Sequence, residues 1–440
     1  MLISDSRVYR RRFYVLFVFC FLAFNQSTFW LTYSPISQSS QQYYNISEST
    51  VNLLLNWGPI IFLPCLPLSY ILLNKRSGLK KTVVLLAIVD FIGMLIRVLP
   101  TLLNLQSSLT LLFVHLGQIL NAACGPLVMS PVTQLSCLWF KPDERTRATT
   151  IALMSPSLGA TMGFLVSPWL VTKGDDVPQL LYFHLILSII ALVMVLIYYP
   201  EYPPEAPSST AQLLIDNSMN AEHQNTLSKY VDDVRRCFQT NSFVELCLLG
   251  GILGGEFAAW TGLIANILSD ENFSEQQCGW FGFICTFCAI IGGLVTSTLA
   301  DTVSFRRSFR LIIIVMLVGC FISVFAFNLF VKTIFSDKSL FESNVMTIGL
   351  CVTFAGFFQG SALPIVYESL AELMFPLPES LSASVLVQLS NLTALFVLLI
   401  PPYFYRVINF FVLISIGFCL LLMFFVNIDY KRRNEDERKQ

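Results

Sequence analysis

The sequence is poor in charge and in histidine. Asp, Glu, Lys and Arg make up 12% of the 440 residues, with three histidines, whereas a soluble domain carries about 25% charged residues. Because the 27 basic and 28 acidic residues nearly cancel, no basic excess favours a nucleic-acid partner. With 55% hydrophobic residues, a soluble enzyme of this length would expose too much apolar surface, and a disordered chain is excluded.

Motifs of catalysis and of metal binding are also missing. The twelve cysteines lie mostly inside apolar runs, so they predict packing rather than a disulfide framework. Cys285-x-x-Cys288 has no second pair to complete a metal or redox site. We find no Gly-x-Ser-x-Gly, phosphate-binding glycine loop or metal-ligand cluster. The chain is therefore expected to be no enzyme, to carry no cofactor, and to lack the nucleotide domain of an ATP-driven pump.

Long apolar runs dominate what is present. A run of roughly 18 or more residues can cross a hydrocarbon layer of about 30 Å as a helix. We predict twelve such spans, at 13–33, 51–73, 82–103, 110–133, 147–170, 180–199, 243–268, 278–299, 309–331, 344–367, 381–402 and 404–427.

The distribution of basic residues predicts the sidedness of these spans, because Lys and Arg concentrate in cytoplasmic loops. With both termini inside, 22 of the 27 Lys and Arg fall on the inner side, the charged tail included. An odd number of spans would put that tail outside. The sequons at Asn45 and Asn272 then fall outside, where glycosylation is expected, whereas those at Asn25 and Asn391 lie within spans and should stay unmodified.

A polar stretch after the sixth span divides the chain into halves. The segment Phe140-Lys-Pro-Asp-Glu144 and the segment Phe375-Pro-Leu-Pro-Glu379 each follow the fourth span of their half, as expected of two parallel repeats. We predict an all-α membrane protein with the major facilitator fold of two six-helix bundles. The predicted limits are a cytoplasmic N-terminus at 1–12, bundles at 13–199 and 243–427, a cytoplasmic linker at 200–242 and a charged cytoplasmic tail at 428–440.

Specific residues carry a family resemblance. The segment Leu55-Asn-Trp57-Gly58-Pro59-Ile60 resembles the second span of solute carrier family 49, the family of the feline leukaemia virus subgroup C receptors. The likeness covers roughly residues 7–427. Further matching segments are Trp139-Phe140, Asp143-Glu144-Arg145, Gly279-Trp280, Gly282-Phe283, Pro364-Ile365, Glu368, Glu372 and Phe375-Pro376.

The resemblance implies solute carriage. Members of the family are associated with choline and ethanolamine, with haem, and in one branch with pyridoxine and a proton gradient. We therefore expect a secondary transporter of a pyridoxine-like or choline-like nutrient, with proton co-transport as an option. The alternatives are a facilitative choline or ethanolamine carrier, a haem exporter, and a non-transporting receptor or sensor. Such a protein would be multi-pass, in the lysosomal or the plasma membrane, and its oligomeric state is not predicted.

One loop departs from the pattern shared across the superfamily. The loop between spans two and three commonly reads G-x-x-x-D-R-x-G-R-K, whereas here Asn74-Lys75-Arg76-Ser77-Gly78 lacks the acid. The equivalent acid of the second half is present as Asp301. Because such acids cap a neighbouring helix end, we expect a weaker inner gate in the first half.

Polar residues within spans are costly in lipid, so they are expected to face a cavity or another helix. In the first span Gln26, Trp30 and Tyr33 share one helix face. An indole attracts a cation or stacks on a pyridine ring, and Trp30 matches the aromatic cavity position of the family; the alternative is an anchor at the membrane interface. We predict that Gln26 and Trp30 contact substrate.

The fourth span adds a second polar stripe, at His115, Gln118 and Asn121. Gln118 and Asn121 are candidates for substrate contact, and the alternative for both is a hydrogen bond between helices. His115 is a candidate for proton coupling, because histidine titrates near neutral pH.

The second half carries its own candidates. In the seventh span, Glu256 lies four residues before Trp260. Burial in hydrocarbon favours the neutral form of a carboxylate, so Glu256 is predicted to couple protons. The alternatives are that it balances the charge of a cationic substrate, forms an ion pair with Arg97, or faces a water-filled funnel. We predict that Trp260 contacts substrate, as do Gln388 and Asn391 in the eleventh span.

The remaining charged residues near the spans are predicted to be structural. Asp90 and Arg97 are expected to hold the third span, through an ion pair between helices. A further set near the inner helix ends is predicted to form gate and loop ion pairs: Glu144, Arg145, Asp301, Glu368, Glu372 and Glu379.

Overall fold

The computed structural model describes residues 9–438, except 34, 104–106, 221–225, 269–270, 272, 274, 303, 334–335, 337–338, 378, 399 and 401–404. The described part of the chain is helical and contains no strand. Its helices are α1 (Arg11–Trp30), α2 (Ser37–Tyr44), α3 (Glu48–Leu73), α4 (Gly78–Leu103), α5 (Ser107–Ala123), α6 (Gly125–Met129), α7 (Val132–Trp139), α8 (Arg145–Leu170), η1 (Gly174–Asp176), α9 (Val177–Ile197), α10 (Ser209–Asn220), α11 (Thr226–Gln239), α12 (Phe243–Gly262), α13 (Ile264–Ile267), α14 (Glu275–Ala300), α15 (Phe309–Phe330), α16 (Val345–Met374), α17 (Glu379–Leu398), α18 (Tyr405–Phe425) and α19 (Lys431–Arg438).

Twelve stretches of the described chain are long and apolar enough to cross a membrane, which is the predicted number. Several boundaries differ from the predicted ones. The tenth span extends to Met374, seven residues beyond its predicted end at 367. The fourth predicted span is divided among α5, α6 and α7, because Pro126 and Pro131 each lack the N–H that would continue the helical ladder.

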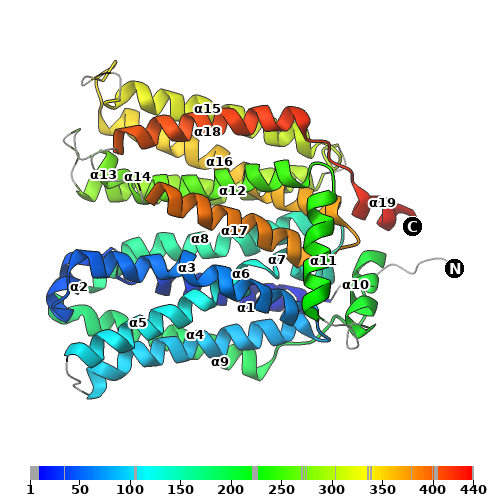
Figure 1. Ribbon diagram of the computed structural model, residues 1–440, viewed down its shortest axis with the longest axis horizontal. Helices are drawn as coiled ribbons and strands as arrows, with labels where there is room; N and C mark the ends of the chain where they lie inside the picture. Colours follow the sequence, from blue (N-terminus) through cyan, green and yellow to red (C-terminus); the bar gives the residue numbers. More distant parts are fainter. Residues whose placement is uncertain are drawn as a thin grey trace. The chain divides into compact units, whose positions relative to one another are not determined.

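The chain forms two compact units. The first contains the described residues of 9–142 and 151–231. Within it α4 packs against α5 and α9, as the lower helices in Figure 1 show. The core of this unit includes Phe29, Val98 and Leu181, all completely buried.

The second unit contains residues 143–150, which include the first residues of α8, and the described residues of 232–438. Here α16 packs against both α14 and α15, and α12 packs against α17 (Figure 1). Glycines permit the closest contacts: a Cβ at Gly356 would lie 2.1 Å from the carbonyl oxygen of Cys285, and one at Gly360 would lie 2.1 Å from that of Ala289. Small residues at such crossings are typical of packing between membrane helices.

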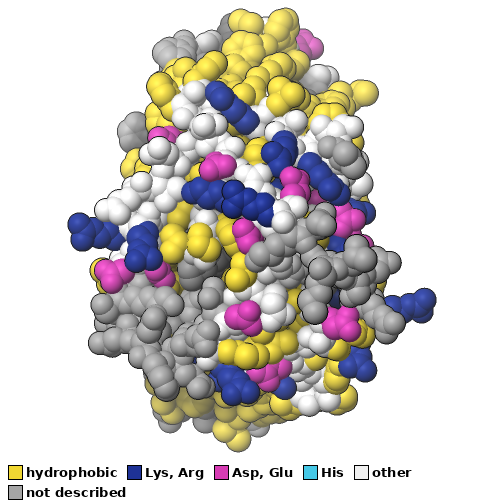
Figure 2. Space-filling model, turned by 90° about the vertical axis from the view of Figure 1, so that its right-hand side faces the viewer, with side chains coloured by type: hydrophobic (Ala, Val, Ile, Leu, Met, Phe, Trp, Pro, Cys, Tyr) yellow, Lys and Arg dark blue, Asp and Glu magenta, His cyan; other side chains and the backbone are white. Residues whose placement is uncertain are grey.

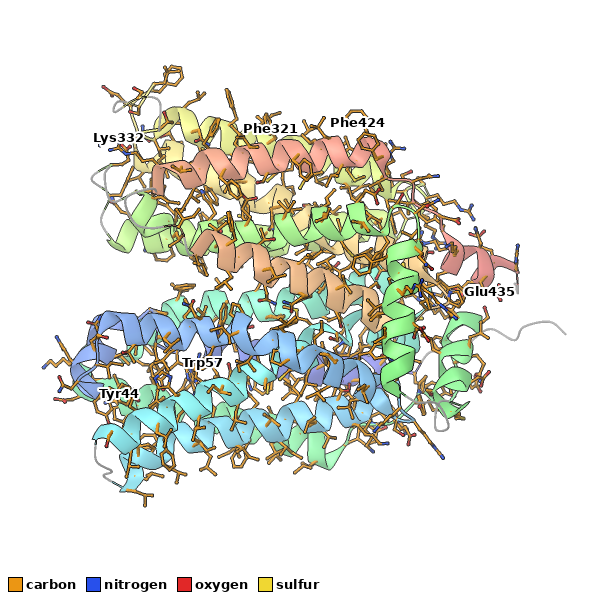
Figure 3. All side chains as sticks on the ribbon, in the orientation of Figure 1. Tyr44, Trp57, Phe321, Lys332, Phe424 and Glu435 are labelled. Carbon is orange, nitrogen blue, oxygen red and sulfur yellow. The ribbon has the colours of Figure 1, made fainter. Side chains whose placement is uncertain are left out.

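Two ends of the second unit can be distinguished by labelled residues. Lys332, which follows α15, lies at one end of the helices, and Glu435 on α19 lies at the other (Figure 3). The predicted sidedness assigns these two ends to opposite sides of the membrane, with Lys332 outside and the tail inside, and this assignment stays a prediction.

Two predicted polar segments contain helices. The segment 200–242 includes α10 and α11, and the charged tail forms α19. The predicted bundle, linker and tail limits themselves stay predictions.

Candidate functional site

The sequence Trp57-Gly58-Pro59 in α3 fixes the position of Trp30, the last residue of α1. The indole Nε1 of Trp30 donates to the carbonyl oxygen of Leu55 at 3.0 Å. In a regular helix that carbonyl would accept from the N–H four residues later, but residue 59 is proline and has no N–H. Pro59 therefore leaves an acceptor on α3 free for Trp30.

Gly58 provides the space for this contact. A Cβ at position 58 would lie 2.6 Å from Nε1 of Trp30 and 3.0 Å from Cε2 of the same ring. Any larger residue would have to displace the indole. Gly58 and Pro59 together hold the half-buried Trp30 ring against α3.

Trp57 connects α3 to the opposite neighbour, α5. Its indole Nε1 donates to Nδ1 of His115 at 3.0 Å, and the two rings meet edge to face with centroids 6.3 Å apart. Figure 3 shows Trp57 on the side of α3 that faces α5. Because Nδ1 of His115 is the acceptor, the neutral ring carries its proton on Nε2. Trp57 was missed as a site residue, and its only sequence signal was the family motif that contains it.

The predicted residues of α1 and α5 form one buried amide network. Nε2 of Gln26 donates to the carbonyl oxygen of Asn121 at 3.3 Å, and Nδ2 of Asn121 donates to that of Gln26 at 3.2 Å. Nε2 of Gln118 donates to the carbonyl oxygen of Trp30 at 3.1 Å. The structure thus brings together Gln26, Trp30, Gln118 and Asn121 within the first unit.

This network has unused acceptors. The side-chain oxygens of Gln118 and Asn121 are enclosed, and neither has a hydrogen-bond partner among the described residues. Buried polar atoms are normally paired, so these two oxygens are exceptional within the network. The predicted alternative, hydrogen bonds between helices, accounts for the amide nitrogens and leaves the oxygens open.

The predicted ion pair between helices is not formed by Asp90 or Arg97 among the described residues. Asp90 Oδ1 accepts from Nδ2 of Asn121 at 3.1 Å, while Arg97 donates to the carbonyl oxygens of Phe29 (2.8 Å) and Gly117 (3.3 Å). The seven-residue separation spans two turns of one helix, about 10 Å, which is too far for an ion pair. Both residues still hold α4 to its neighbours, as predicted.

In the second unit, no side-chain hydrogen bond joins the predicted site residues Glu256 and Trp260 to each other in the described part. Trp260 is completely buried; its Nε1 donates to Oδ1 of Asn409 at 2.9 Å, and its ring meets Phe327 edge to face at 5.2 Å. The ring thus serves packing between α12, α15 and α18, so we do not include the predicted substrate contact of Trp260 in the proposed site. Glu256 is 2% exposed beside Ser415, and its Oε1 has no partner in the described part.

The two candidates on α17 are half-buried. Nδ2 of Asn391 donates to the carbonyl oxygen of Val387 in its own helix at 3.1 Å. Oε1 of Gln388 is enclosed and has no partner among the residues described. Gln388 thus has a free acceptor for a ligand, whereas the amide of Asn391 is engaged locally.

The predicted gate residues take part in a charged cluster within the second unit. Glu368 on α16 binds the guanidinium of Arg432 on α19 and accepts a hydrogen bond from the hydroxyl of Thr149 on α8. Arg145 pairs with Asp436 at 2.9 Å. Figure 2 shows basic and acidic side chains interspersed on the face where α19 lies. We call this set the tail cluster; its members are Arg145, Thr149, Glu368, Glu372, Arg432, Arg433 and Asp436.

Glu372 accepts hydrogen bonds from two arginines of the tail cluster. Its Oε2 accepts from the backbone N–H of Arg433 at 3.0 Å, and its Oε1 accepts from Nε of Arg433 at 3.1 Å and from Nε of Arg432 at 3.4 Å. Arg432, at 1% exposed, is as buried as a core residue. The charged tail forms α19, which packs against α16; its predicted cytoplasmic position stays a prediction.

Two other predicted gate residues lie beside this cluster. Asp301 accepts from the backbone N–H of Arg147 at 3.0 Å and from its Nε at 3.2 Å. Burial raises the pKa of Asp301 to about 6, against the lowering effect of hydrogen bonds from Thr146 and Arg147. Glu144 is half-buried, and its carbonyl accepts from the N–H of Ala148 at 3.0 Å.

The loop that lacks the usual acid has another acidic partner. Ser77 donates its hydroxyl proton to the carboxylate of Glu201, and its backbone N–H donates to the hydroxyl of Tyr202 at 2.9 Å. Both partners come just after α9. An acid thus reaches this loop from a different segment of the first unit.

Of the two predicted glycosylation sites, Asn45 is exposed at the end of α2. Asn272 lies outside the described residues. In the described part, no group of three or more His, Cys, Asp or Glu is arranged to hold a metal ion.

The chain is similar in sequence to known proteins. The Major Facilitator Superfamily model matches residues 15–335. A solute carrier family 49 member 4 homolog of Xenopus tropicalis is 30% identical, covering 96% of this chain and 91% of that protein. The choline/ethanolamine transporter flvcr2a of Danio rerio is 25% identical, covering 87% and 78%.

Solved structures share the fold. The E. coli fucose:proton symporter FucP superimposes with a TM-score of 0.69 at 9% identity, over 94% of this chain and 99% of that one. The proton:xylose symporter XylE gives 0.64 at 13% identity, over 94% and 95%. Twelve membrane helices with this likeness define a multi-pass transporter of the major facilitator class. The chain belongs to the Major Facilitator Superfamily and, within it, to solute carrier family 49, which confirms the predicted family and fold.

Proposed function

We propose that the protein is a secondary transporter that moves a small organic nutrient, pyridoxine-like or choline-like, by alternating access and with proton coupling. The observation that carries the proposal is the fixed ring of Trp30, bound to Leu55 of α3 and adjacent to Gln118, whose side-chain oxygen has no partner in the described chain.

The chemistry of these groups fits such a ligand. An indole face attracts an organic cation by ~0.5–2 kcal/mol, depending on its exposure to water, and it stacks equally on a pyridine ring. The free oxygen of Gln118 would accept a hydroxyl donor, which choline and pyridoxine both have. Gln26 and Asn121 would position Gln118 and Trp30 through their contacts between α1 and α5.

Proton coupling is the second part of the proposal. The fucose and xylose symporters with the same fold are named as proton symporters. Their names suggest proton coupling, but the likeness itself shows the fold alone. Glu256 and His115 are candidate proton carriers by sequence. His115 has its Nδ1 engaged by Trp57, so a proton taken up at that atom would have to break this bond.

The transport assay described below also tests the alternative functions. Relatives named as choline/ethanolamine transporters favour a facilitative choline or ethanolamine carrier, and a haem exporter is the third transport option. A non-transporting receptor or sensor would show no saturable exchange with any solute. We propose the lysosomal or plasma membrane as its location, to be decided by imaging of the tagged full-length protein, and a glycan on Asn45.

Counterflow in proteoliposomes tests the function. Vesicles loaded with unlabelled pyridoxine or choline should accumulate the labelled compound saturably, and Trp30→Ala and Gln118→Ala should each abolish this exchange. Trp169→Ala is the matched control, because that indole on α8 is 78% exposed. Wild-type vesicles that exchange neither compound, haem nor ethanolamine would support the sensor. Normal exchange by both site variants would remove the site assignment.

A further inference from the structure

Asp90 lies midway along α4 and is almost completely enclosed, with 1% of its surface exposed. Its Oδ1 accepts one hydrogen bond, from Nδ2 of Asn121 at 3.1 Å. Its Oδ2 is also enclosed, and no described residue gives it a hydrogen bond. An ionised carboxylate in this position would keep one oxygen unpaired in a medium of low dielectric constant, which is strongly disfavoured.

Among the described residues, no cation forms an ion pair with the carboxylate, and Arg97 acts on it only from a distance. Arg97, two turns away on the same helix, donates instead to carbonyl oxygens of α1 and α5. The junction of α5 and α6 contributes the thiol of Cys124, and α3 contributes Cys65 beside it. His184 of α9 lies near Arg97, with its Nδ1 3.3 Å from the hydroxyl of Thr32, and the uncharged Gln26 of α1 bonds to Asn121.

We propose that Asp90 is the proton-binding site of this transporter, with the proton on Oδ2 in the conformation described here. This inference rests on the proposed transport function and deepens it by naming the site of the coupled ion. The proton is taken up from one side of the membrane and converts the carboxylate into a neutral acid. It leaves when α4 becomes hydrated toward the other side.

A short chain of hydrogen bonds joins this proton to the substrate candidates. The same amide nitrogen of Asn121 donates to Asp90 and to the carbonyl oxygen of Gln26, one turn before Trp30 on α1. An ionised Asp90 attracts the amide more strongly than a neutral one does, so deprotonation competes with the bond to Gln26. By linkage, substrate bound at Trp30 and Gln118 must affect proton affinity in the same measure.

Glu256 is the rival carboxylate, and its surroundings differ. It lies beside Ser415 and the thiols of Cys320 and Cys419. Trp260, the predicted substrate residue on its own helix, is bonded to Asn409. In the part of the chain that the structure describes, no side-chain hydrogen bond joins Glu256 to a predicted substrate contact, so the geometry favours Asp90.

Infrared spectroscopy of the purified protein in lipid nanodiscs tests the protonation without any transport. At neutral pH the wild type should show the carbonyl band of a protonated carboxylic acid, and labelling with ¹³C-aspartate should shift that band. Asp90→Asn should remove it, whereas Glu256→Gln and Asp301→Asn should keep it. Because the buried Glu256 can contribute a band of its own, the decisive signal is the component that ¹³C-aspartate shifts. The absence of such a component, or an aspartate component that persists in Asp90→Asn, would overturn the proposal. The measurement with ¹³C-aspartate uses the wild type, so it remains valid even if Asp90→Asn does not fold.

Transport in proteoliposomes gives the second arm. Accumulation of labelled pyridoxine or choline driven by a pH gradient should fall by about tenfold or more in Asp90→Asn, while exchange without a gradient persists measurably and Asp90→Glu retains the gradient effect. Equal loss of both activities in a folded Asp90→Asn would contradict a coupling role. If the wild type exchanges neither compound, the proposed function fails, and the infrared result still decides whether Asp90 holds a proton.

Discussion

The indole of Trp57 donates its proton to Nδ1 of His115 across 3.0 Å, and this bond joins α3 to α5. It occupies the one histidine that the sequence offered as a proton carrier in the fourth span. The same part of α3 contains Leu55, whose carbonyl oxygen accepts from the indole of Trp30 on α1. Helix α3 therefore binds an aromatic ring on each of these two neighbours.

Replacing Trp57 by Phe should weaken this junction. The variant keeps a ring and loses one hydrogen bond of about 1 kcal/mol, so the melting temperature should fall by roughly 2–4 °C for a unit of this size. Thermal unfolding of the purified protein measures the change. His115→Gln retains a side-chain acceptor and should be milder than His115→Phe; equal melting temperatures for all three variants and the wild type would show that the bond does not stabilise the fold.

Gly58→Ala should impair transport by moving Trp30. Its Cβ would lie 2.6 Å from the indole nitrogen, and overpacking of this kind typically costs about 1–3 kcal/mol. We expect the KM of labelled substrate to rise by roughly five- to a hundredfold, since about 1.4 kcal/mol is a factor of ten.

Gly279→Ala is the control for this prediction, because a Cβ at that position meets nothing within 4 Å. Pro59→Ala gives an independent test. It restores an N–H that competes with Trp30 for the carbonyl oxygen of Leu55, so it should also raise KM. Normal kinetics in both Gly58→Ala and Pro59→Ala would mean that the position of Trp30 is irrelevant to uptake.

Helical spacing and span polarity were enough to predict the twelve-span fold and to group Gln26 with Trp30 and Gln118 with Asn121. The role of Trp57 could not be predicted in this way, because it depends on which helix packs against α3. Trp260 shows the converse limit. Spacing gives the helix face on which a side chain lies, but not whether a neighbour such as Asn409 covers that face.

The charged tail shows a different limit of the sequence. A run of closely spaced basic and acidic residues is typical of solvated surface, and nothing local to it indicates burial. Its partners, Glu368 and Glu372, precede Arg432 by 64 and 60 residues in the chain. Only the packing of α19 on α16 brings them together.

Glu368→Gln should destabilise the protein strongly. It leaves Arg432, at 1% exposed, without one of its two carboxylates, and loss of one partner from a buried pair costs about 3–5 kcal/mol. Glu437→Gln is the control, since its pair with Arg307 is more than half exposed and such pairs contribute at most about 1 kcal/mol. The double variant Glu368→Gln with Arg432→Met should recover part of the loss. Similar melting temperatures for Glu368→Gln and Glu437→Gln would refute a stabilising role of the tail cluster.

Asn45→Gln should remove a glycan and increase mobility on a gel. Asn45 is exposed, and Ser47 of the same sequon caps α3 by accepting from the N–H of Thr50. Ser47→Thr preserves both the sequon and the cap, so its glycan should remain, whereas Ser47→Ala should lose the glycan and about 1 kcal/mol of cap stabilisation. If the wild type from the native membrane is insensitive to glycosidase, the predicted outer position of this loop loses its support.

Asp301 predicts a pH dependence of stability with a definite sign. Burial raises its pKa from 3.8 to about 6 in the folded protein, so the folded state binds the proton more tightly than the unfolded chain does. The resulting stabilisation is complete below about pH 4 and is lost as the pH rises through 6. A rise of about two in pKa corresponds to at most ~3 kcal/mol. Asp301→Asn is permanently neutral and keeps an oxygen that can accept from Arg147. The melting temperature of the wild type minus that of Asp301→Asn should therefore decrease between pH 4 and 6 and then level off. A difference that is constant with pH, or one that increases, would show that the ion pair with Arg147 outweighs burial at this position.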